Sequence, residues 1–266
     1  MKDFINERWR AILAFNGLND FDAIWKHEAA WFEEPNQRRG GWSGVARCEL
    51  RLPEGGSAPV FLKRQENHST PTWRHPQRGE PTFMREFRRI MDCRRRAIPT
   101  LEPVYFGTRM HEGKQQAILM TEELTGYISL EDRVQAWLRD GMPPRSERLL
   151  VIDAVARLVR QVHAHRIRHG CLFPKHVFVR INPDGSSDAR VIDLEKSRRR
   201  PLRVMCAQRD LYSLSRESST VWSRTDKLRF FERYLEIDRL NTYGKWLWRN
   251  VTEHAERKHA ARQSSQ

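Results

Sequence analysis

The sequence predicts an α+β fold in two lobes, a small strand-rich lobe followed by a larger helical lobe. Two patterns carry this prediction. Apolar and polar residues alternate around two glycine clusters between residues 39 and 65, which is typical of a β-hairpin. After Gly126, apolar residues recur instead at the spacing of amphipathic helices. We therefore expect an N-terminal lobe over residues 1–123 and a helical lobe over residues 124–266.

The N-terminal lobe is expected to begin with two helices before its first strand. Apolar residues from Trp9 to Leu18 have amphipathic spacing, and a second helix is predicted from Asp20 to a point before Pro35. Two paired strands, a helix and two further strands should follow, at Val45–Leu52, Pro59–Arg64, Phe83–Met91, Val104–Phe106 and Ala117–Thr121.

The C-terminal lobe is predicted to be mainly helical. One helix covers SLEDRVQAWLRDG, and a longer one covers ERLLVIDAVARLVRQVHAHRI, whose apolar residues form one face. Two short strands, HVFVRI and ARVIDL, flank a turn at Asn182–Gly185. Helix returns from about Gln208, and a polar tail is expected from about Glu256 onward.

The charge balance predicts an anionic partner. The chain has 48 Lys and Arg against 34 Asp and Glu, a formal charge of +14, and 39 of the basic residues are Arg. The planar guanidinium forms forked contacts with phosphate and carboxylate groups. Nucleic acid, an anionic membrane and a phosphorylated substrate satisfy this charge equally. No recognition-helix, zinc or RNP-type motif accompanies it, so we do not expect nucleic-acid binding.

Other compositional features narrow the cellular setting. No run approaches the roughly 20 apolar residues of a membrane-spanning helix, and the charged start MKDFINERWR is unlike a signal peptide. The four cysteines form no CxxC pair, which favours reduced thiols. The sequence therefore predicts a cytoplasmic protein.

Several residues occur in the order that phosphoryl transfer from ATP requires. Lys63 ends the strand VFLK, the pattern of a phosphate-binding lysine, and Glu86 follows on the next predicted helix, where it can pair with that lysine. A plain surface lysine and carboxylate would explain either residue taken alone. The order of the downstream motifs favours the kinase interpretation.

The segment HGCLFPKHVFV, residues 169–179, has the form of a kinase catalytic loop followed by a strand. Cys171 stands in the place of the catalytic aspartate, and His176 in the place of the asparagine. After the hairpin, VIDLE puts Asp193 where a magnesium-binding aspartate is expected. Asp210 begins the next helix in the place of a residue that braces the loop.

Taken together, these motifs resemble the lipopolysaccharide core kinase (Kdo/WaaP) family, most closely its InaA-type branch. The resemblance is carried by WFEEPNQRRGGWS, VFLKRQ, PTFMREFRR, HGCLFPKHVFV and VIDLEKSRRR, and extends over about residues 20–215. It implies a protein-kinase-like fold, ATP and Mg²⁺ as cofactors, and a sugar hydroxyl of the lipopolysaccharide core, heptose or Kdo, as phosphate acceptor. The partner implied is the core oligosaccharide or a lipid-linked precursor.

Two departures from the kinase pattern leave an alternative open. A neutral thiol at Cys171 is a poor proton acceptor for a sugar hydroxyl. His176 offers nitrogen where Mg²⁺ prefers oxygen, so metal binding is expected to depend on Asp193, with Glu195 as a second carboxylate. His176 is equally consistent with a buried histidine that braces the loop. A pseudokinase that keeps the fold for binding or regulation is therefore the second hypothesis.

Further residues are candidates for nucleotide binding. Gly41 and Gly44 lie in GGWSGV, where the backbone can approach phosphates, although a hairpin turn explains them as well. Glu122 and Glu123 follow the apolar strand AILM, so their backbone is the expected adenine-binding hinge, although any two-lobed protein also needs a connector there.

Basic residues of the second lobe are candidates for substrate binding. Lys175 and the run Arg198–Arg200 are expected to bind the acceptor, with a solvated basic loop as the alternative for the run. The C-terminal segments KLRFFERYLEIDRL and KWLWRN mix aromatic and basic residues. This composition suits peripheral contact with an anionic inner-membrane surface, although ordinary packing on the helical lobe explains it better.

Overall fold

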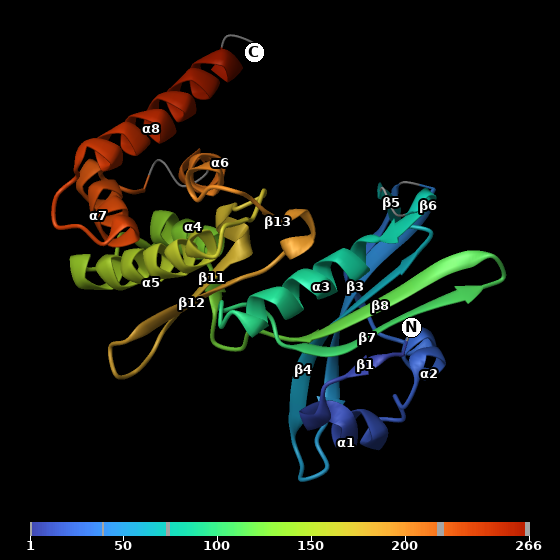
Figure 1. The fold of residues 1–266 in the computed structure, drawn as a ribbon. Coiled ribbons are helices and arrows are strands. Elements are labelled where there is room, and N and C mark those ends of the chain that lie inside the picture. The colour runs from blue at the N-terminus through green and yellow to red at the C-terminus, as the bar shows by residue number, and fades with distance from the viewer. Residues whose placement is uncertain (1, 39, 73–74, 217–220, 264–266) are drawn as a thin grey trace. The chain divides into compact units, whose positions relative to one another are not determined.

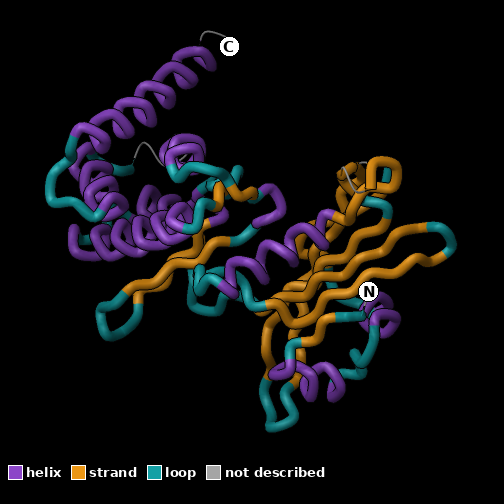
Figure 2. Tube along the Cα trace, viewed as in Figure 1, coloured by secondary structure: helices purple, strands orange, loops and turns teal. Residues whose placement is uncertain are grey.

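The computed structural model describes residues 2–38, 40–72, 75–216 and 221–263, and the chain divides into two compact units (Figure 1). The first unit comprises Met1–Asp92 and Leu101–Thr125, and the second comprises Cys93–Thr100 and Gly126–Gln266. Figure 2 shows that strands dominate the first unit and helices the second. The α+β fold class predicted from the sequence is confirmed.

The first unit is built on a six-stranded antiparallel sheet with the strand order β1-β7-β8-β4-β3-β2. The strands of this sheet are β1 (Phe4–Ile5), β2 (Trp31–Arg38), β3 (Gly41–Arg51), β4 (Ser57–Glu66), β7 (Pro103–His111) and β8 (Lys114–Glu122). A separate hairpin, β5 (Ser69–Thr72) and β6 (His75–Pro81), follows β4 along the chain. The helices are α1 (Glu7–Phe15), α2 (Phe21–Lys26) and α3 (Thr82–Arg95), which continues into the second unit.

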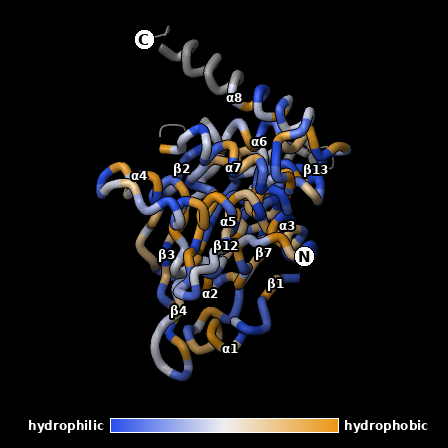
Figure 3. Tube along the Cα trace, turned by 90° about the vertical axis from the view of Figure 1, so that its left-hand side faces the viewer, coloured by the Kyte–Doolittle hydropathy of each residue, from blue (hydrophilic) through white to orange (hydrophobic). Residues whose placement is uncertain are grey.

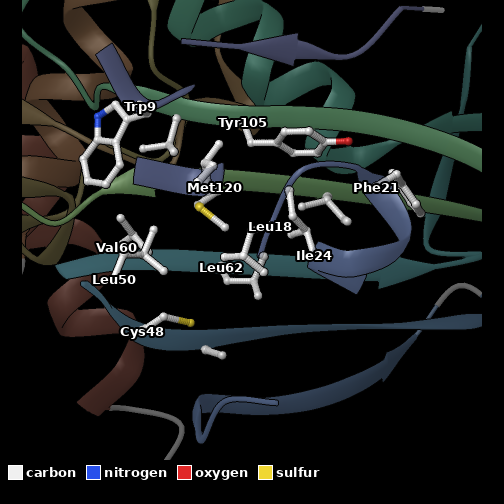
Figure 4. Close-up of a cluster of buried hydrophobic side chains, with 14 residues drawn as sticks. Trp9, Leu18, Phe21, Ile24, Cys48, Leu50, Val60, Leu62, Tyr105 and Met120 are labelled. Atoms are coloured by element: carbon white, nitrogen blue, oxygen red, sulfur yellow. The ribbon is translucent and has the colours of Figure 1, made fainter. Parts of the chain in front are cut away.

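The N-terminal helices pack on this sheet and form a hydrophobic core with it (Figure 4). Each helix begins at a side-chain cap: Asn6 accepts from the N–H of Arg8 for α1, and Asp20 accepts from Ala23 for α2. The buried side chains of this cluster include Trp9, Leu13, Phe21, Ile24, Leu50, Val60, Leu62, Tyr105 and Met120. Burial of this apolar surface stabilises the unit.

The second predicted helix is much shorter than expected, and the segment after it is a strand. Helix α2 ends at Lys26, and Trp31–Arg38 forms edge strand β2 instead of helix. Pro35 lies within that strand, at register shifts that mark a bulge. The Trp31 ring is held by the guanidinium of Arg64, 4.8 Å from the ring centroid.

The order strand, strand, helix, strand, strand predicted for the lobe is present, as β3, β4, α3, β7 and β8. Each of these elements is longer than the sequence pattern indicated. β3 and β4 pair over ten residue pairs, from Trp42 opposite Glu66 to Arg51 opposite Ser57. In the same register Val45 lies opposite Lys63, which fixes the position of that lysine in the sheet.

The second unit is mainly helical, with short strands around its loops. Its helices are α4 (Leu130–Asp140), α5 (Arg145–Ala164), α6 (Val204–Arg216), α7 (Arg224–Leu235) and α8 (Thr242–Gln263). Its strands are β9 (Ile128–Ser129), β10 (Ile167–Arg168), β11 (Val177–Ile181), β12 (Ser187–Val191) and β13 (Arg198–Arg199), with 3₁₀ turns η1 (Pro174–His176) and η2 (Leu194–Lys196). The helix α8 continues through the expected polar tail to Gln263.

Helix α5 is the packing centre of this unit. Its apolar side chains, from Val151 to Val162, are almost completely buried, and Figure 3 shows hydrophobic residues (orange) along it. The hairpin of β11 and β12 packs against α5. Residues 93–100 join the unit because Thr100 Oγ1 donates to the carbonyl of Val191 at 2.7 Å. Within the described ranges, no helix is both long and apolar enough to cross a bilayer.

Candidate functional site

Candidate functional residues lie in both units, and the two sets are described separately. In the first unit, Lys63 Nζ and Glu86 Oε1 lie 2.7 Å apart. The Lys63 side chain is 19% exposed and that of Glu86 is 3% exposed, so the ion pair is largely shielded from water. The pairing expected from the sequence therefore forms. A shielded ion pair of this kind restrains the ammonium, and water and salt screen it less than they screen an exposed pair.

The two candidate glycines of the first unit are explained by packing within that unit. A Cβ atom at Gly41 would overlap the backbone carbonyl oxygen of Glu66. A Cβ atom at Gly44 would lie 2.7 Å from Cζ3 of the Trp31 ring. The structure therefore accounts for both glycines through close approach of strands and an aromatic ring, without any phosphate ligand.

Glu122 and Glu123 are tied into the first unit by both backbone and side chain. Their N–H groups donate to carbonyl oxygens of that unit at 2.9 and 3.0 Å. The carboxylate of Glu122 accepts from Trp9 Nε1 at 2.7 Å, and that of Glu123 accepts from Arg47 Nε at 2.6 Å. The backbone N–H groups of Glu122 and Glu123 are both engaged in hydrogen bonds within the unit. An adenine ring that binds to this segment therefore needs a donor from another residue.

In the second unit, Asp210 anchors the loop that begins at His169. Its Oδ2 accepts from the N–H of His169 at 2.6 Å, and its Oδ1 accepts from the N–H of Gly170 at 2.9 Å. His163 Nε2 lies 3.2 Å from the same carboxylate. Burial alone would raise the pKa of Asp210, but these hydrogen bonds and the neighbouring histidines outweigh burial, and the pKa is lowered. The bracing role expected for Asp210 is thus visible in its contacts.

The side chain of His169 is buried and forms part of the same structure. Its Nε2 lies 2.8 Å from the carbonyl oxygen of Ile192, and the N–H of Cys171 donates to its Nδ1 at 3.3 Å. A carbonyl can only accept, so Nε2 carries the proton of the neutral ring. Burial lowers the pKa of His169, consistent with this neutral form. These contacts give His169 a structural role.

The loop brings His176 and Asp193 together. His176 Nδ1 donates to the carbonyl oxygen of Cys171 at 2.8 Å, and its Nε2 lies 3.4 Å from Asp193 Oδ2. Asp193 has φ 57° and ψ 55°, in the left-handed region that non-glycine residues rarely adopt. Such a conformation costs about 1–3 kcal/mol and persists where the surroundings enforce it, most often at functional sites.

The metal ligands predicted from the sequence are only partly brought together. Among the residues described, no three His, Cys, Asp or Glu side chains are grouped closely enough to hold a metal ion, so Glu195 does not join His176 and Asp193. Mg²⁺ keeps several waters and commonly uses one or two protein carboxylates together with substrate phosphates. Asp193 offers the one carboxylate that this mode of binding requires.

Cys171 lies in the loop at the position predicted for the catalytic base. Its thiol is free and the residue is half-buried. Its backbone N–H and carbonyl are held by His169 and His176 respectively. The loop conformation therefore fixes the position of this residue, whatever its chemical role.

The basic candidates for acceptor binding differ in their surroundings. Lys175 is exposed in the turn η1. Arg198 and Arg199 are exposed on β13, and Arg200 is half-buried. None of these three arginines forms an ion pair with a carboxylate in the described part of the chain.

The sequence did not indicate the buried residues that contact Asp210 next to the loop. His163 Nδ1 lies 2.9 Å from the hydroxyl of Tyr234, and its Nε2 faces Asp210, so that both ring nitrogens have partners. A histidine within the apolar face of α5 was the available signal, because a buried polar ring needs such partners. Arg168 and Arg209 were also missed, because only the strand register and the packing of α6 bring them near Arg200.

An antiparallel sheet with a shielded lysine–glutamate pair, followed by a helical unit whose loop is braced by a buried aspartate, defines the protein-kinase-like class of fold. The chain belongs to the lipopolysaccharide kinase (Kdo/WaaP) family, whose model matches residues 22–234.

Individual relatives agree with this assignment. Protein InaA of Escherichia coli (strain K12) is 32% identical over 200 residues, covering 74% of this chain and 88% of that protein. The lipopolysaccharide core heptose(I) kinase WaaP of Pseudomonas aeruginosa is 31% identical over 157 residues, covering 56% of this chain and 58% of that protein. The solved structure described as WaaP in complex with acyl carrier protein has a TM-score of 0.68 at 21% identity, covering 97% of this chain and 98% of that one. This structural match shows the shared fold.

Proposed function

We propose that this protein is an ATP- and Mg²⁺-dependent kinase that phosphorylates a hydroxyl of a lipopolysaccharide inner-core sugar, heptose or Kdo. The observation that carries the proposal is the ion pair between Lys63 and Glu86, at 2.7 Å, in a chain of the Kdo/WaaP family. Relatives described as core heptose kinases support the acceptor class. A shielded ammonium held by a carboxylate is what binding of a nucleotide phosphate requires.

Each residue of the proposed site has a defined task. Lys63 binds the phosphates, and Glu86 holds its ammonium in place. Asp193 holds the metal ion, while Asp210 keeps the loop of His169 in shape through the two backbone N–H groups that it accepts. Magnesium, when bound, neutralises charge on the transferred phosphoryl group.

Cys171 replaces the carboxylate that orients an acceptor hydroxyl in other kinases. Phosphoryl transfer proceeds in most analyses through a loose transition state, in which the attacking hydroxyl needs little early deprotonation. The thiol therefore lowers the rate without removing the other contributions, which are positioning and electrostatic stabilisation. We expect a slow kinase.

The second candidate function is a pseudokinase that binds a nucleotide without efficient transfer. The observation that favours it is the same loop, where a thiol occupies the base position and His176 faces Asp193. Nucleotide binding without turnover would distinguish this function from the first.

We also propose that the protein works at the cytoplasmic face of the inner membrane. Four exposed apolar side chains in the second unit support this location, and they are Leu202, Met205, Tyr243 and Trp246. Tyr243 and Trp246 stack at 5.8 Å on α8, and basic residues lie nearby in sequence. An exposed apolar set beside cations suits an anionic bilayer surface.

The test is direct phosphorylation of a dephosphorylated core oligosaccharide by purified protein with Mg-ATP, with the product detected by mass spectrometry. Asp193→Ala should abolish product formation, whereas Arg145→Gln, an exposed change on α5, should not. Product at the wild-type level from Asp193→Ala would overturn the assignment of the site. Thermal stabilisation by Mg-ATP with no product on any core acceptor would establish the pseudokinase instead. Cys171→Asp should raise the rate if the natural protein lacks its base.

A further inference from the structure

Strands β10 and β13 of the second unit carry arginines on one face. They pair antiparallel with Arg168 opposite Arg198, and the N–H of Arg200 extends the ladder by donating to the carbonyl of Arg166 at 2.8 Å. Side chains alternate between the two faces along each strand. Arg168, Arg198 and Arg200 therefore share one face. Arg199, although in the same run, lies on the other.

A fourth arginine comes from helix α6, which packs against β10 and lies beside β13 in Figure 1. Burial, followed by the charges of Arg200 and Arg209, lowers the pKa of Arg168, whereas the charge of Asp210 opposes this change. Both oxygens of Asp210 already accept hydrogen bonds from the loop. The four residues that form this arginine face are Arg168, Arg198, Arg200 and Arg209.

Buried donors on these strands have no partner within the described residues. The Nε atoms of Arg168 and Arg200 are buried without a hydrogen bond. No described carboxylate forms an ion pair with any member of the arginine face. Buried donors and charges without partners are destabilising, as are like charges opposite each other on paired strands. An anionic ligand on the arginine face would give the buried donors an acceptor, balance the unpaired charges and reduce the repulsion between Arg168 and Arg198.

We infer that the arginine face is a binding site for a phosphate group carried by the acceptor. Forked guanidinium groups match the geometry of phosphate oxygens and form charge-assisted hydrogen bonds with them. The inference rests on the proposed function for the identity of the ligand, because Lys63 and Asp193 already serve the nucleotide. Arg168 directly precedes His169 in the chain, so the face adjoins the loop that receives the acceptor hydroxyl in kinases.

The first test measures binding of inorganic phosphate to the full chain by titration calorimetry. Arg168→Gln and Arg200→Gln should weaken binding roughly tenfold or more, as expected for lost hydrogen bonds to a charged group. Arg199→Gln, on the opposite face of the same strand, and Arg145→Gln, exposed on α5, should change it less than about twofold, because exposed charges are strongly screened. Equal weakening by all four substitutions would show a general charge effect and overturn the inference.

Three controls separate the arginine face from the nucleotide site and from misfolding. Saturating Mg-ADP should leave phosphate binding unchanged, and competition would assign the face to the nucleotide. Arg200→Lys, which keeps the charge but loses the fork, should retain part of the affinity. Each variant should keep the thermal midpoint of the wild type, which shows that a loss of affinity does not come from misfolding. If Arg200→Lys bound phosphate as poorly as Arg200→Gln, charge would not be the basis of recognition.

The second test compares acceptors that differ only in one phosphate group remote from the reacting hydroxyl. Arg200→Gln should raise KM for the phosphorylated acceptor several-fold and leave KM for ATP unchanged. The two proposals fail separately. Asp193→Ala should lose turnover yet keep phosphate binding, whereas a protein with normal turnover that binds no phosphate would refute only the arginine face.

Discussion

The carboxylate of Asp210 on α6 accepts hydrogen bonds from two successive backbone N–H groups, those of His169 and Gly170, at 2.6 and 2.9 Å. A carboxylate has two accepting oxygens, whereas an amide has one accepting oxygen and one donating nitrogen. The conformation of the loop that contains Cys171 therefore depends on ionised Asp210. This relationship leads to two predictions about stability.

Asp210→Asn should lower the free energy of unfolding by about 2–3 kcal/mol, because one of the two N–H groups would face the amide nitrogen instead of an oxygen. Urea denaturation followed by circular dichroism measures the change. Asp184→Asn is the matched control, since Asp184 lies exposed in a turn, and it should change stability by less than about 0.5 kcal/mol. Equal effects of the two substitutions would show that Asp210 does not brace the loop.

The contribution of Asp210 to stability should disappear in acid. Because the pKa of Asp210 is lowered from its ordinary value of 3.8, the folded protein favours the ionised form. The stabilisation is complete above pH 3.8 and is lost as the pH falls through the lower pKa of the folded state. The difference in unfolding free energy between wild type and Asp210→Asn should thus be constant near neutral pH and shrink below pH 3.8. A difference that grows in acid would contradict this assignment.

The ion pair of the first unit should behave as a coupled unit. Lys63→Met removes the partner of a carboxylate that is 3% exposed, so it should destabilise the protein by about 3 kcal/mol. The double variant Lys63→Met with Glu86→Gln should lose less than the sum of the two single variants, because no buried charge is left behind. A double-mutant cycle in urea measures this coupling. Additivity within about 0.5 kcal/mol would indicate that the pair contributes no specific interaction.

The elements that could be predicted from sequence are those with strong local patterns. Lys63 ends an alternating strand and Glu86 lies on an amphipathic helix, so their pairing followed from the order of the elements. The first part of strand β2 was expected to be helical because residues 31–34 show no alternation, and the helix was expected to end before Pro35. It is a strand because the Trp31 ring packs over the backbone of Gly44, a contact between residues thirteen apart that no local pattern reveals.

The candidate site also contains residues that a local pattern reveals and residues that only the tertiary structure brings together. The loop residues Cys171, His176 and Asp193 were found from a motif, since the motif fixes their order along the chain. The arginine face could not be found this way, because Arg168 meets Arg198 only through the register of two strands of two residues each. Arg200 and Arg199 looked equivalent in the sequence, and only the alternation of β13 separates them.

The cysteines should differ strongly in reactivity. Cys171 is half-buried, whereas Cys48, Cys93 and Cys206 are at most 5% exposed. Burial raises the pKa of Cys48, and burial followed by the charge of Asp210 raises that of Cys206 to about 11. Iodoacetamide at pH 8 should therefore label Cys171 first, as read by peptide mass spectrometry, and Cys171→Ser should remove the fast phase. Labelling of Cys206 at the same rate would show that the second unit opens readily.

Substitution of the two glycines of β3 distinguishes a packing role from a phosphate-binding role for these residues. Gly41→Ala should destabilise the protein by about 1–3 kcal/mol, because the added methyl overlaps a backbone carbonyl that cannot move without breaking the β3–β4 pairing. Gly44→Ala should cost less, because its methyl meets the Trp31 ring, and a side chain on an edge strand can shift. Thermal and urea unfolding measure both changes. If Gly41→Ala instead leaves stability unchanged and weakens Mg-ATP binding, the glycine serves the nucleotide, and the packing explanation for Gly41 is wrong.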